Sequence, residues 1–234
     1  MAIINCGFLI LMILIRDVEL CREKSRDQSN INKRIISLNE YKIEVQKIIA
    51  EIRKPSERLS DDIVDYLLEN LNNAQQTYKF GSVFHYNATD FYQQFSTTTR
   101  DDIQILSGGR LGHPNAISHY ICICYRHRQH IVYIYDSLFR LKITKRHREI
   151  MQKLYPAAII YKHKKPATLQ HDSTSSGLFA IAYATMLILG KDPTTYELKL
   201  NTTEGADQGS FMREHLIKML QAKKLSLFPS TDQL

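Results

Sequence analysis

The chain has 234 residues, of which 44% are hydrophobic and 24% are charged, with a formal net charge of +7. This composition excludes a disordered chain and is typical of one globular domain with an extension. The four cysteines lack metal-ligand spacing, so we expect no metal and no cofactor. Their usage fits a reducing compartment, which indicates an intracellular protein of the nucleus or the cytoplasm.

The front of the chain is wholly apolar from Phe8 to Ile15. A secretory signal would carry basic residues before this run and small residues after it, and the sequence has neither. The run is also shorter than the roughly 20 residues that span a membrane. The pattern favours a segment that docks on the body of the protein, or a gene-model extension, over a secretory signal or a membrane anchor.

The next segment, residues 17–53, is charged with apolar residues at intervals. This spacing predicts one or two helices that pack on the body or on a partner helix. Pro55 closes the segment. We therefore divide the chain into an apolar N-terminus with a helical extension, residues 1–54, and a catalytic-type domain, residues 55–234.

Short elements follow one another through the domain. Ser60 predicts the N-cap of a helix that runs to about Leu71, with Asp61 and Asp62 in its first turn. We then expect strands at 77–86, 103–106, 121–125, 130–135 and 157–161, and helices at 88–95 and 212–220. The strands at 121–125 and 130–135 should be antiparallel neighbours. Helices packed around a small mixed or antiparallel sheet predict the α+β class.

Basic residues cluster between Arg140 and Lys165, chiefly at 145–148 and 162–165. Apolar residues recur among them near helical spacing, so an amphipathic helix with a solvated basic face is the simpler interpretation. The alternative is a patch for an acidic partner, either a protein or a nucleic acid.

The segment Leu169–Gly190 organises the domain. From Leu178 to Leu189 nearly every residue is apolar, which predicts a buried central helix. It begins at or just after Ser176-Gly177. A nucleophile at this point would gain from the helix N-terminus, although an ordinary capping serine fits the same pattern.

Two polar residues flank the predicted antiparallel strands. His119 stands at the start of the first strand, and Asp136 stands at the end of the second. Together with a nucleophile at a helix N-terminus, this order predicts a triad in which the aspartate orients the histidine and the histidine takes the proton of the nucleophile.

In this order the motifs resemble the ubiquitin-like-protein (SUMO) protease family of cysteine peptidases. The matching segments are Leu59–Val64, His119-Tyr120, Tyr135–Leu138, Gln170 and, six residues later, Ser176-Gly177. The resemblance covers Leu59 to the C-terminus. It implies a cysteine-protease-like fold in which the buried central helix carries the nucleophile position at its N-terminus.

The resemblance also implies a function. The family hydrolyses the bond after the C-terminal Gly-Gly of a ubiquitin-like protein, SUMO or a relative. By resemblance, Ser176 occupies the nucleophile position, Gln170 and the backbone N–H of Ser176 stabilise the oxyanion, and His119 and Asp136 complete the catalytic set. Contacts with the partner or substrate are implied for Asp61, Tyr120 and Gly177.

The chain departs from the family at several of these positions. The family nucleophile is cysteine, whereas position 176 is serine, and Tyr120 replaces a tryptophan. A hydroxyl does not ionise near neutral pH as an activated thiol does, so we expect weak or absent activity. Three hypotheses follow: a serine-variant peptidase, a pseudo-protease that binds a ubiquitin-like or other acidic partner without cleavage, and a basic adaptor. Retention of the remaining catalytic set weakens the third.

Overall fold

The computed structural model describes residues 42–75, 83–86, 101–107, 119–139, 145–203 and 206–231. The apolar front of the chain and the helix predicted at 88–95 lie outside these residues. The chain divides into two compact units, Met1–Ile48 and Ile49–Leu234. Residues 42–52 are helical. The remaining elements all lie in the second unit.

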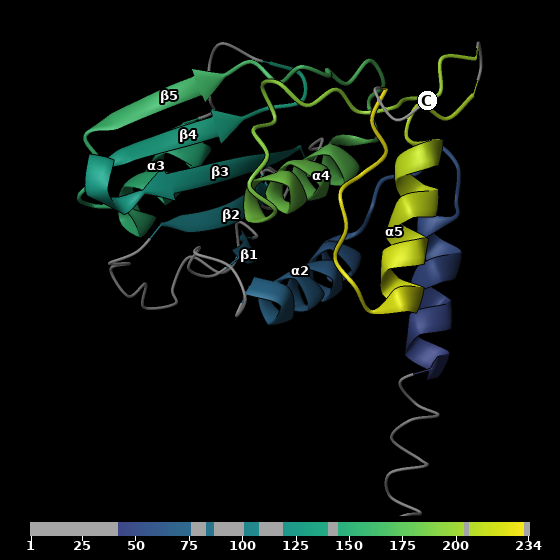
Figure 1. Cartoon of the computed structure of the whole chain (residues 1–234). Helices are drawn as coiled ribbons and strands as arrows, with labels where there is room; N and C mark the ends of the chain where they lie inside the picture. The colour runs from purple at the N-terminus through teal and green to yellow at the C-terminus, as the bar shows by residue number, and fades with distance from the viewer. Residues whose placement is uncertain are drawn as a thin grey trace, which may run out of the picture. The chain divides into compact units, whose positions relative to one another are not determined.

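The second unit begins with a helix, continues with four strands among its described residues, and then has a helix, a fifth strand and two further helices (Figure 1). In chain order they are α2 (Asp61–Gln75), β1 (Val83–Tyr86), β2 (Asp102–Ser107), β3 (Tyr120–Arg126), η1 (His127–Gln129), β4 (Ile131–Tyr135), α3 (Lys145–Leu154), β5 (Ile160–Lys164), α4 (Ser176–Ile188) and α5 (Ser210–Ala222).

The described strands form one mixed sheet in the order β1-β2-β3-β4-β5. The two outer pairs, β1 with β2 and β4 with β5, are parallel. The two inner pairs are antiparallel, including the predicted neighbours β3 and β4. The predicted α+β class with a small mixed sheet is therefore confirmed.

The last strand begins later than the sequence predicts. Residues 156–157 form a turn, and β5 runs from Ile160 to Lys164 rather than from 157 to 161. The turn closes α3, with the N–H of Ala158 donating to the carbonyl of Tyr155 at 2.9 Å. The basic residues that follow continue the strand because their backbone pairs with β4.

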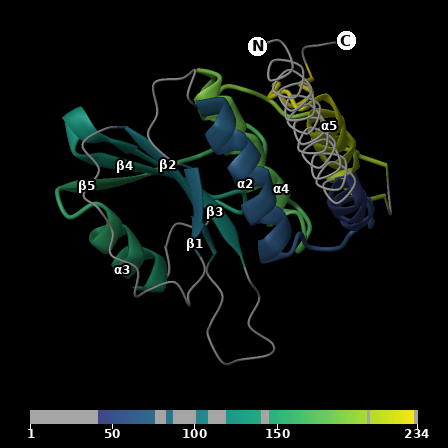
Figure 2. The same cartoon turned by 90° about the horizontal axis from the view of Figure 1, so that it is seen from below.

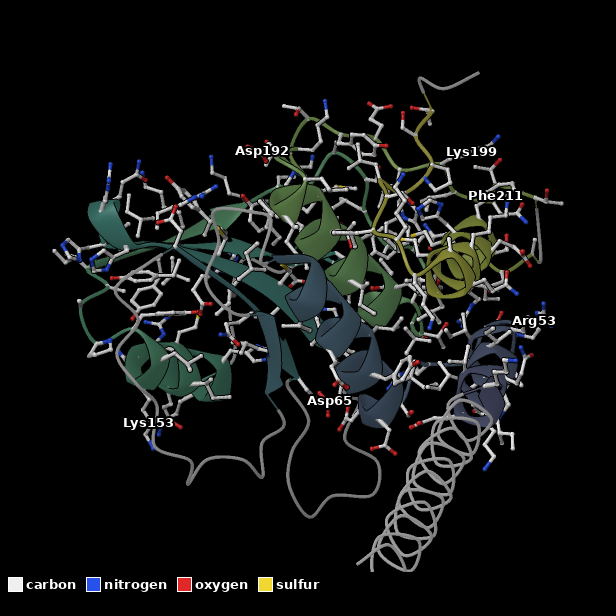
Figure 3. All side chains as sticks on the ribbon, turned by 60° about the horizontal axis from the view of Figure 1, so that its bottom comes forward. Arg53, Asp65, Lys153, Asp192, Lys199 and Phe211 are labelled. Carbon is white, nitrogen blue, oxygen red and sulfur yellow. The ribbon has the colours of Figure 1, made fainter. Side chains whose placement is uncertain are left out.

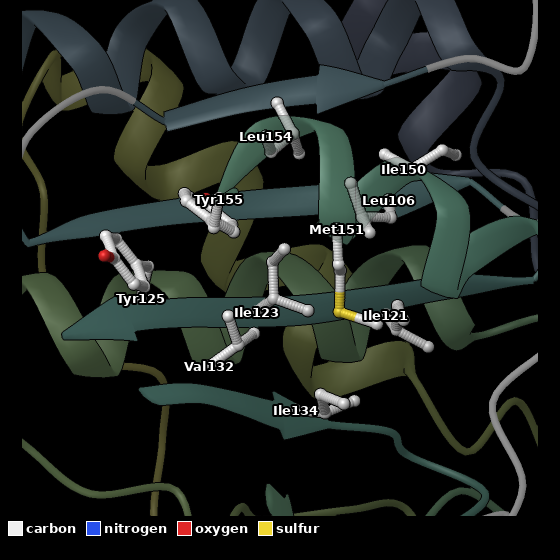
Figure 4. Packing of buried hydrophobic residues seen from close by; sticks show 10 residues of the cluster. All are labelled: Leu106, Ile121, Ile123, Tyr125, Val132, Ile134, Ile150, Met151, Leu154 and Tyr155. Carbon is white, nitrogen blue, oxygen red and sulfur yellow. The ribbon is translucent and has the colours of Figure 1, made fainter. Parts of the chain in front are cut away.

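One face of the sheet packs against α3 around a hydrophobic cluster (Figure 4). Tyr155, just after α3, stacks on Tyr125 of β3 with ring centroids 4.5 Å apart. The Tyr155 hydroxyl donates to the carboxylate of Asp102 at 2.8 Å, which satisfies a buried charge. The cluster consists of Leu106, Ile121, Ile123, Tyr125, Val132, Ile134, Ile150, Met151, Leu154 and Tyr155.

The other face of the sheet packs against α4, with α2 beside it (Figure 2). Every residue of α4 is buried, which confirms the predicted central helix. Cys122 and Cys124 alternate with the residues that face α3, so they share the opposite face. Burial raises the pKa of the Cys122 thiol, and raises that of Cys124 to about 12. Both are core thiols, and neither is poised to react.

The helix α2 begins as predicted and runs longer. The Ser60 hydroxyl accepts the N–H of Ile63 at 3.4 Å, as an N-cap does, and the helix continues to Gln75. Among the side chains of residues 61–69, the buried apolar ones are Ile63, Val64, Leu67 and Leu68. This start brings the segment before α2 next to the first turn of α4.

A buried arginine connects α5 to the segment before α2. The guanidinium of Arg213 donates to the carboxylate of Asp207 at 2.8 Å and to the carbonyl of Ile52 at 3.0 Å. It also donates to the carbonyl of Glu57. Burying a guanidinium is costly unless it is hydrogen-bonded, and here each of its three nitrogens has an acceptor. None of the helices in the described residues is long and apolar enough to cross a membrane.

Candidate active site

The ends of two neighbouring strands bring His119 and Asp136 together. His119 directly precedes β3 and Asp136 directly follows β4, so the antiparallel pairing places them at the same edge of the sheet. The Nε2 atom of His119 lies 2.7 Å from Oδ1 of Asp136, and both side chains are buried. The N–H of Leu138 also donates to this carboxylate, at 2.9 Å.

This pairing defines the chemistry of the imidazole. A carboxylate can only accept a hydrogen bond, so Nε2 of His119 carries the proton and donates. In the neutral ring the lone pair then lies on Nδ1. Asp136 fixes the orientation of the imidazole, which is the geometry that a general base would need.

Ser176 lies next to His119. Its hydroxyl accepts the backbone N–H of Tyr120, the residue after His119, at 3.4 Å. Ser176 is the first residue of α4, and α4 packs against β3. The structure thus brings together the histidine, the aspartate and the serine, although His119 and Ser176 are 57 residues apart in the sequence.

The start of α4 also offers backbone donors. In the part of the chain that the structure describes, the N–H groups of Ser176 and Gly177 have no hydrogen-bond acceptor. They belong to the first turn, where the positive end of the helix dipole lies. These groups can stabilise an anion that forms on a carbonyl attacked at Ser176.

Gln170 lies close to this centre, but its amide points elsewhere. Its Nε2 donates to the carbonyl and to Oδ1 of Asp172, at 2.8 and 3.1 Å. Its Oε1 accepts the Ser137 hydroxyl at 2.7 Å. Both donors of the amide are therefore in use, and an oxyanion role for Gln170 would require one of them to exchange its partner.

Asp172 organises the loop before α4, and our sequence analysis missed it. Its carboxylate accepts the N–H groups of Thr174 and Ser175 and the Ser175 hydroxyl, each at 2.7 Å. Burial raises the pKa of Asp172, but these hydrogen bonds from Ser175, Thr174 and Gln170 outweigh it and hold the pKa below its usual value. An aspartate two and three residues before Thr174 and Ser175 is a turn and capping signal that could have identified it.

The three predicted partner-binding residues come together beside the serine. The Tyr120 hydroxyl donates to Oδ1 of Asp61 and to the carbonyl of Leu59. A Cβ atom at Gly177 would lie 3.4 Å from Cβ of Leu59 and 3.5 Å from the Tyr120 ring. The start of α2, β3 and the first turn of α4 therefore meet here, with glycine at the closest approach.

Two further histidines surround Asp136. His147 of α3 is buried, and that burial, reinforced by the charge of His119 and opposed by Asp136, lowers its pKa to about 4. His163 of β5 also has a lowered pKa, because burial outweighs the attraction of Asp136. In the sequence, both histidines stand within the basic runs at 145–148 and 162–165. The spacing of 147 from Ile150, Met151 and Leu154 indicates a shared buried helix face.

The arrangement of His119, Asp136 and Ser176 could support proton transfer by the imidazole combined with nucleophilic attack from position 176. Within the described ranges, no group of three histidine, cysteine, aspartate or glutamate side chains could hold a metal ion.

No protein-family model and no curated protein matches this chain. Its fold resembles several solved structures. One is the C-terminal Ulp1 protease domain in complex with Smt3, the yeast ortholog of SUMO, at 10% identity over 77% of this chain and 83% of that one, with a TM-score of 0.48. Another, of the SUMO protease Ulp1 with its catalytic cysteine oxidised to a sulfonic acid, has 12% identity over 77% and 94% and a TM-score of 0.49. The Chlamydia trachomatis effector protein ChlaDUB1 has 11% identity over 83% and 96%, with a TM-score of 0.42. Each of these is a likeness of fold at low sequence identity.

Proposed function

We propose that this chain carries a peptidase-type site of the ubiquitin-like-protein protease family, directed at the bond after the C-terminal Gly-Gly of a SUMO-like protein. The observation that carries the proposal is the convergence at one point of a paired His119–Asp136, the hydroxyl of Ser176 and the first turn of α4. These are the three parts that acyl transfer needs: a base with its orienting carboxylate, a nucleophile position and oxyanion donors.

In this proposal the residues act in a defined order. Nδ1 of His119 removes the proton of the nucleophile as the nucleophile bonds to the terminal glycine carbonyl. The N–H groups of Ser176 and Gly177 stabilise the oxyanion. His119 then protonates the departing amine, and water releases the acyl group by the same route. Asp136 holds the imidazolium throughout.

The serine makes this site slow or silent. A hydroxyl must lose its proton during the attack itself, and its shorter bonds change the reach to the carbonyl; an error of about 1 Å can cost about 10²-fold. The engaged amide of Gln170 gives a second reason, because it donates to Asp172. This observation favours a second candidate function, in which the chain binds a ubiquitin-like partner without cleaving it.

The partner surface in this proposal begins at Asp61, Tyr120 and Gly177, which lie together beside the serine. A ubiquitin-like protein would place its body near the start of α2 and its C-terminal tail near Gly177. Such a partner is consistent with the nuclear or cytoplasmic location that the cysteine usage predicts.

The test compares five forms of the full chain for binding and for cleavage of SUMO and of ubiquitin, each carrying a C-terminal aminocoumarin reporter. They are the unchanged chain, Ser176→Ala, Ser176→Cys, Ser173→Cys, and Ser176→Cys combined with His119→Ala. Ser173 is an exposed serine of the same loop, so its replacement adds a thiol outside the proposed centre. We expect Ser176→Cys to release the reporter. The unchanged chain should release none, or release it at a rate at least about 10²-fold lower than that of Ser176→Cys.

Each outcome has a distinct meaning. If the unchanged chain is active and Ser176→Ala is not, the chain is a serine-variant peptidase. If only Ser176→Cys is active and the unchanged chain still binds the reporter protein, the chain is a binding protein with a silenced site. If Ser176→Cys and Ser173→Cys behave alike, or if the His119→Ala combination keeps full activity, the proposed site is wrong.

A further inference from the structure

The outer edge of β5 is a strand edge without a neighbour in the part of the chain that the structure describes. β5 is the last strand in the order of the sheet. The N–H of Ile160 donates to the carbonyl of His130, toward β4. Because hydrogen bonding alternates along a parallel strand, the N–H and C=O groups of Tyr161 and His163 face the outer edge. No described residue bonds to them.

The side chains at this edge are aliphatic and basic. Ile159 and Ile160 are 78% and 43% exposed, which makes them two of the few large hydrophobic residues on the described surface. Lys162 follows on the same face as Ile160 and is exposed. Lys164, next on that face, lies with its Nζ 5.1 Å from the centre of the Tyr133 ring. The edge therefore presents apolar area at one end and cations at the other.

Further cations surround the edge. The segment Lys145–Lys165 contains seven lysine or arginine residues and one acidic residue, Glu149. Arg148 of α3 acts electrostatically on Tyr161 and His163, so the basic side of α3 extends to β5. Figure 3 shows Lys153 on the side of α3 that points away from the sheet. The excess positive charge of the chain is thus concentrated around an open strand edge.

We propose that the outer edge of β5 binds an extended acidic peptide of a partner protein by strand addition. The backbone of the peptide pairs with Tyr161 and His163, its acidic side chains lie along Lys162 and Lys164, and an aliphatic residue covers Ile159 and Ile160. The edge offers alternating donors and acceptors, which a peptide backbone matches and a phosphate backbone does not. The exposed apolar residues are aliphatic rather than aromatic, which disfavours base stacking. The proposal is independent of Ser176.

The first arm of the test varies the peptide and leaves the protein intact. The probe is a fluorescein-labelled peptide of about ten residues in which glutamate alternates with valine. Two modified peptides carry N-methyl groups on all glutamate amides or on all valine amides. In a strand, successive residues point their N–H groups to opposite edges, so all glutamate N–H groups face one edge and all valine N–H groups face the other. We expect one modified peptide to bind the full chain at least about tenfold more weakly than the parent and the other to bind within about threefold of it.

The second arm varies the protein. His163→Pro removes an N–H that faces outward, so it should weaken the parent peptide about tenfold or more while β4 and β5 stay paired, which circular dichroism checks. Lys162→Glu with Lys164→Glu should have a similar effect. The matched control is Lys218→Glu with Lys224→Glu, which makes the same change in charge at two exposed lysines elsewhere and should leave binding within about threefold.

Four results would overturn the proposal. The first is that no peptide binds, and the second is that both methylated peptides bind equally, which means charge attraction without strand pairing. The third is that a single-stranded oligonucleotide binds the lysines and the peptide does not displace it, which assigns the surface to nucleic acid. The fourth is a dimer in sedimentation that His163→Pro dissociates, which assigns the edge to a second copy of this chain.

Discussion

Two buried or half-buried aspartates lie within the same site and have opposite surroundings. Asp136 accepts a hydrogen bond from the imidazole of His119, and His147 and His163 lie close enough to interact with its charge. Asp172 accepts hydrogen bonds from two backbone N–H groups, two hydroxyls and a side-chain amide. The partners of Asp136 are imidazoles, which can carry a positive charge, whereas the partners of Asp172 are neutral donors that cannot.

The difference assigns the two carboxylates to different tasks. Asp136 can stabilise a positive charge that appears on an imidazole during a reaction. Asp172 can only hold a shape, namely the loop that delivers Ser176 to the start of α4. In the proposed function, the same functional group serves chemistry at one position and architecture at the other, and mutations should separate the two.

The largest expected effect is on turnover. In the Ser176→Cys chain, Asp136→Asn should lower reporter release by about 10³- to 10⁴-fold, because an amide can neither fix the required tautomer nor stabilise an imidazolium. Asp172→Asn in the same background serves as the comparison and should cost far less. Equal losses in the two variants would mean that both aspartates serve the same task.

The second effect is on stability at acid pH. The pKa of His147 falls from its usual 6.5 to about 4, so the unfolded chain binds the proton first and stability is lost as the pH falls from 6.5 toward 4. Between pH 7 and 4.5 we expect a loss of about 2 to 3 kcal/mol from this residue. Urea unfolding of the unchanged chain and of His147→Leu at both pH values measures it. If the two chains lose the same free energy, His147 is not the buried neutral group described above.

The third effect concerns the loop. Asp172→Ala removes five hydrogen bonds to a half-buried carboxylate and should lower the free energy of unfolding at pH 7 by about 2 kcal/mol, allowing for solvent screening. Asp172→Asn keeps one acceptor oxygen and should lose about half as much. The pKa of Asp172 is lowered by folding, so its contribution is complete above the usual value of 3.8 and is lost as the pH falls below it. The difference between Asp172→Ala and the unchanged chain should therefore shrink in that acid range and persist between pH 5 and 7.

The smallest effect concerns a third aspartate, Asp61, whose described partner is a phenol. Tyr120→Phe removes the hydroxyl that donates to it and should lower the free energy of unfolding by about 0.5 to 1 kcal/mol. Denaturant unfolding of Tyr120→Phe, Asp61→Asn and the double variant measures the pairing as a cycle. Additive losses would mean that the two side chains do not interact in solution.

The sequence predicts the parts of the site that depend on strand ends and helix starts. His119 before β3 and Asp136 after β4 had to meet once the two strands paired as neighbours. Position 176 had to lie at the N-terminus of α4, because the apolar residues after it are buried on all sides of the helix. In each case the pattern of apolar residues predicts a strand or a helix, and the position of a residue in that element determines where its Cβ atom lies.

The parts that failed depend on choices among side-chain partners. Nothing in the order of residues says whether Gln170 donates toward Ser176 or toward Asp172, since both lie within reach of one loop. His147 was misread because it stands in a run of charges, and only its helical phase distinguishes it from them. The start of β5 was misplaced because pairing with β4 outweighs the polarity of its side chains.

The position of Arg213 has a consequence for how the protein is made. Its guanidinium holds the carbonyls of Ile52 and Glu57, which leave the ribosome long before it does. Those carbonyls precede Leu59, whose Cβ would lie against any side chain at position 177. Translation must therefore pass α5 before this arginine can hold the segment that leads to Leu59. A chain released before Arg213 would contain His119, Asp136 and Ser176 and still lack the contact that holds one side of their surroundings in place.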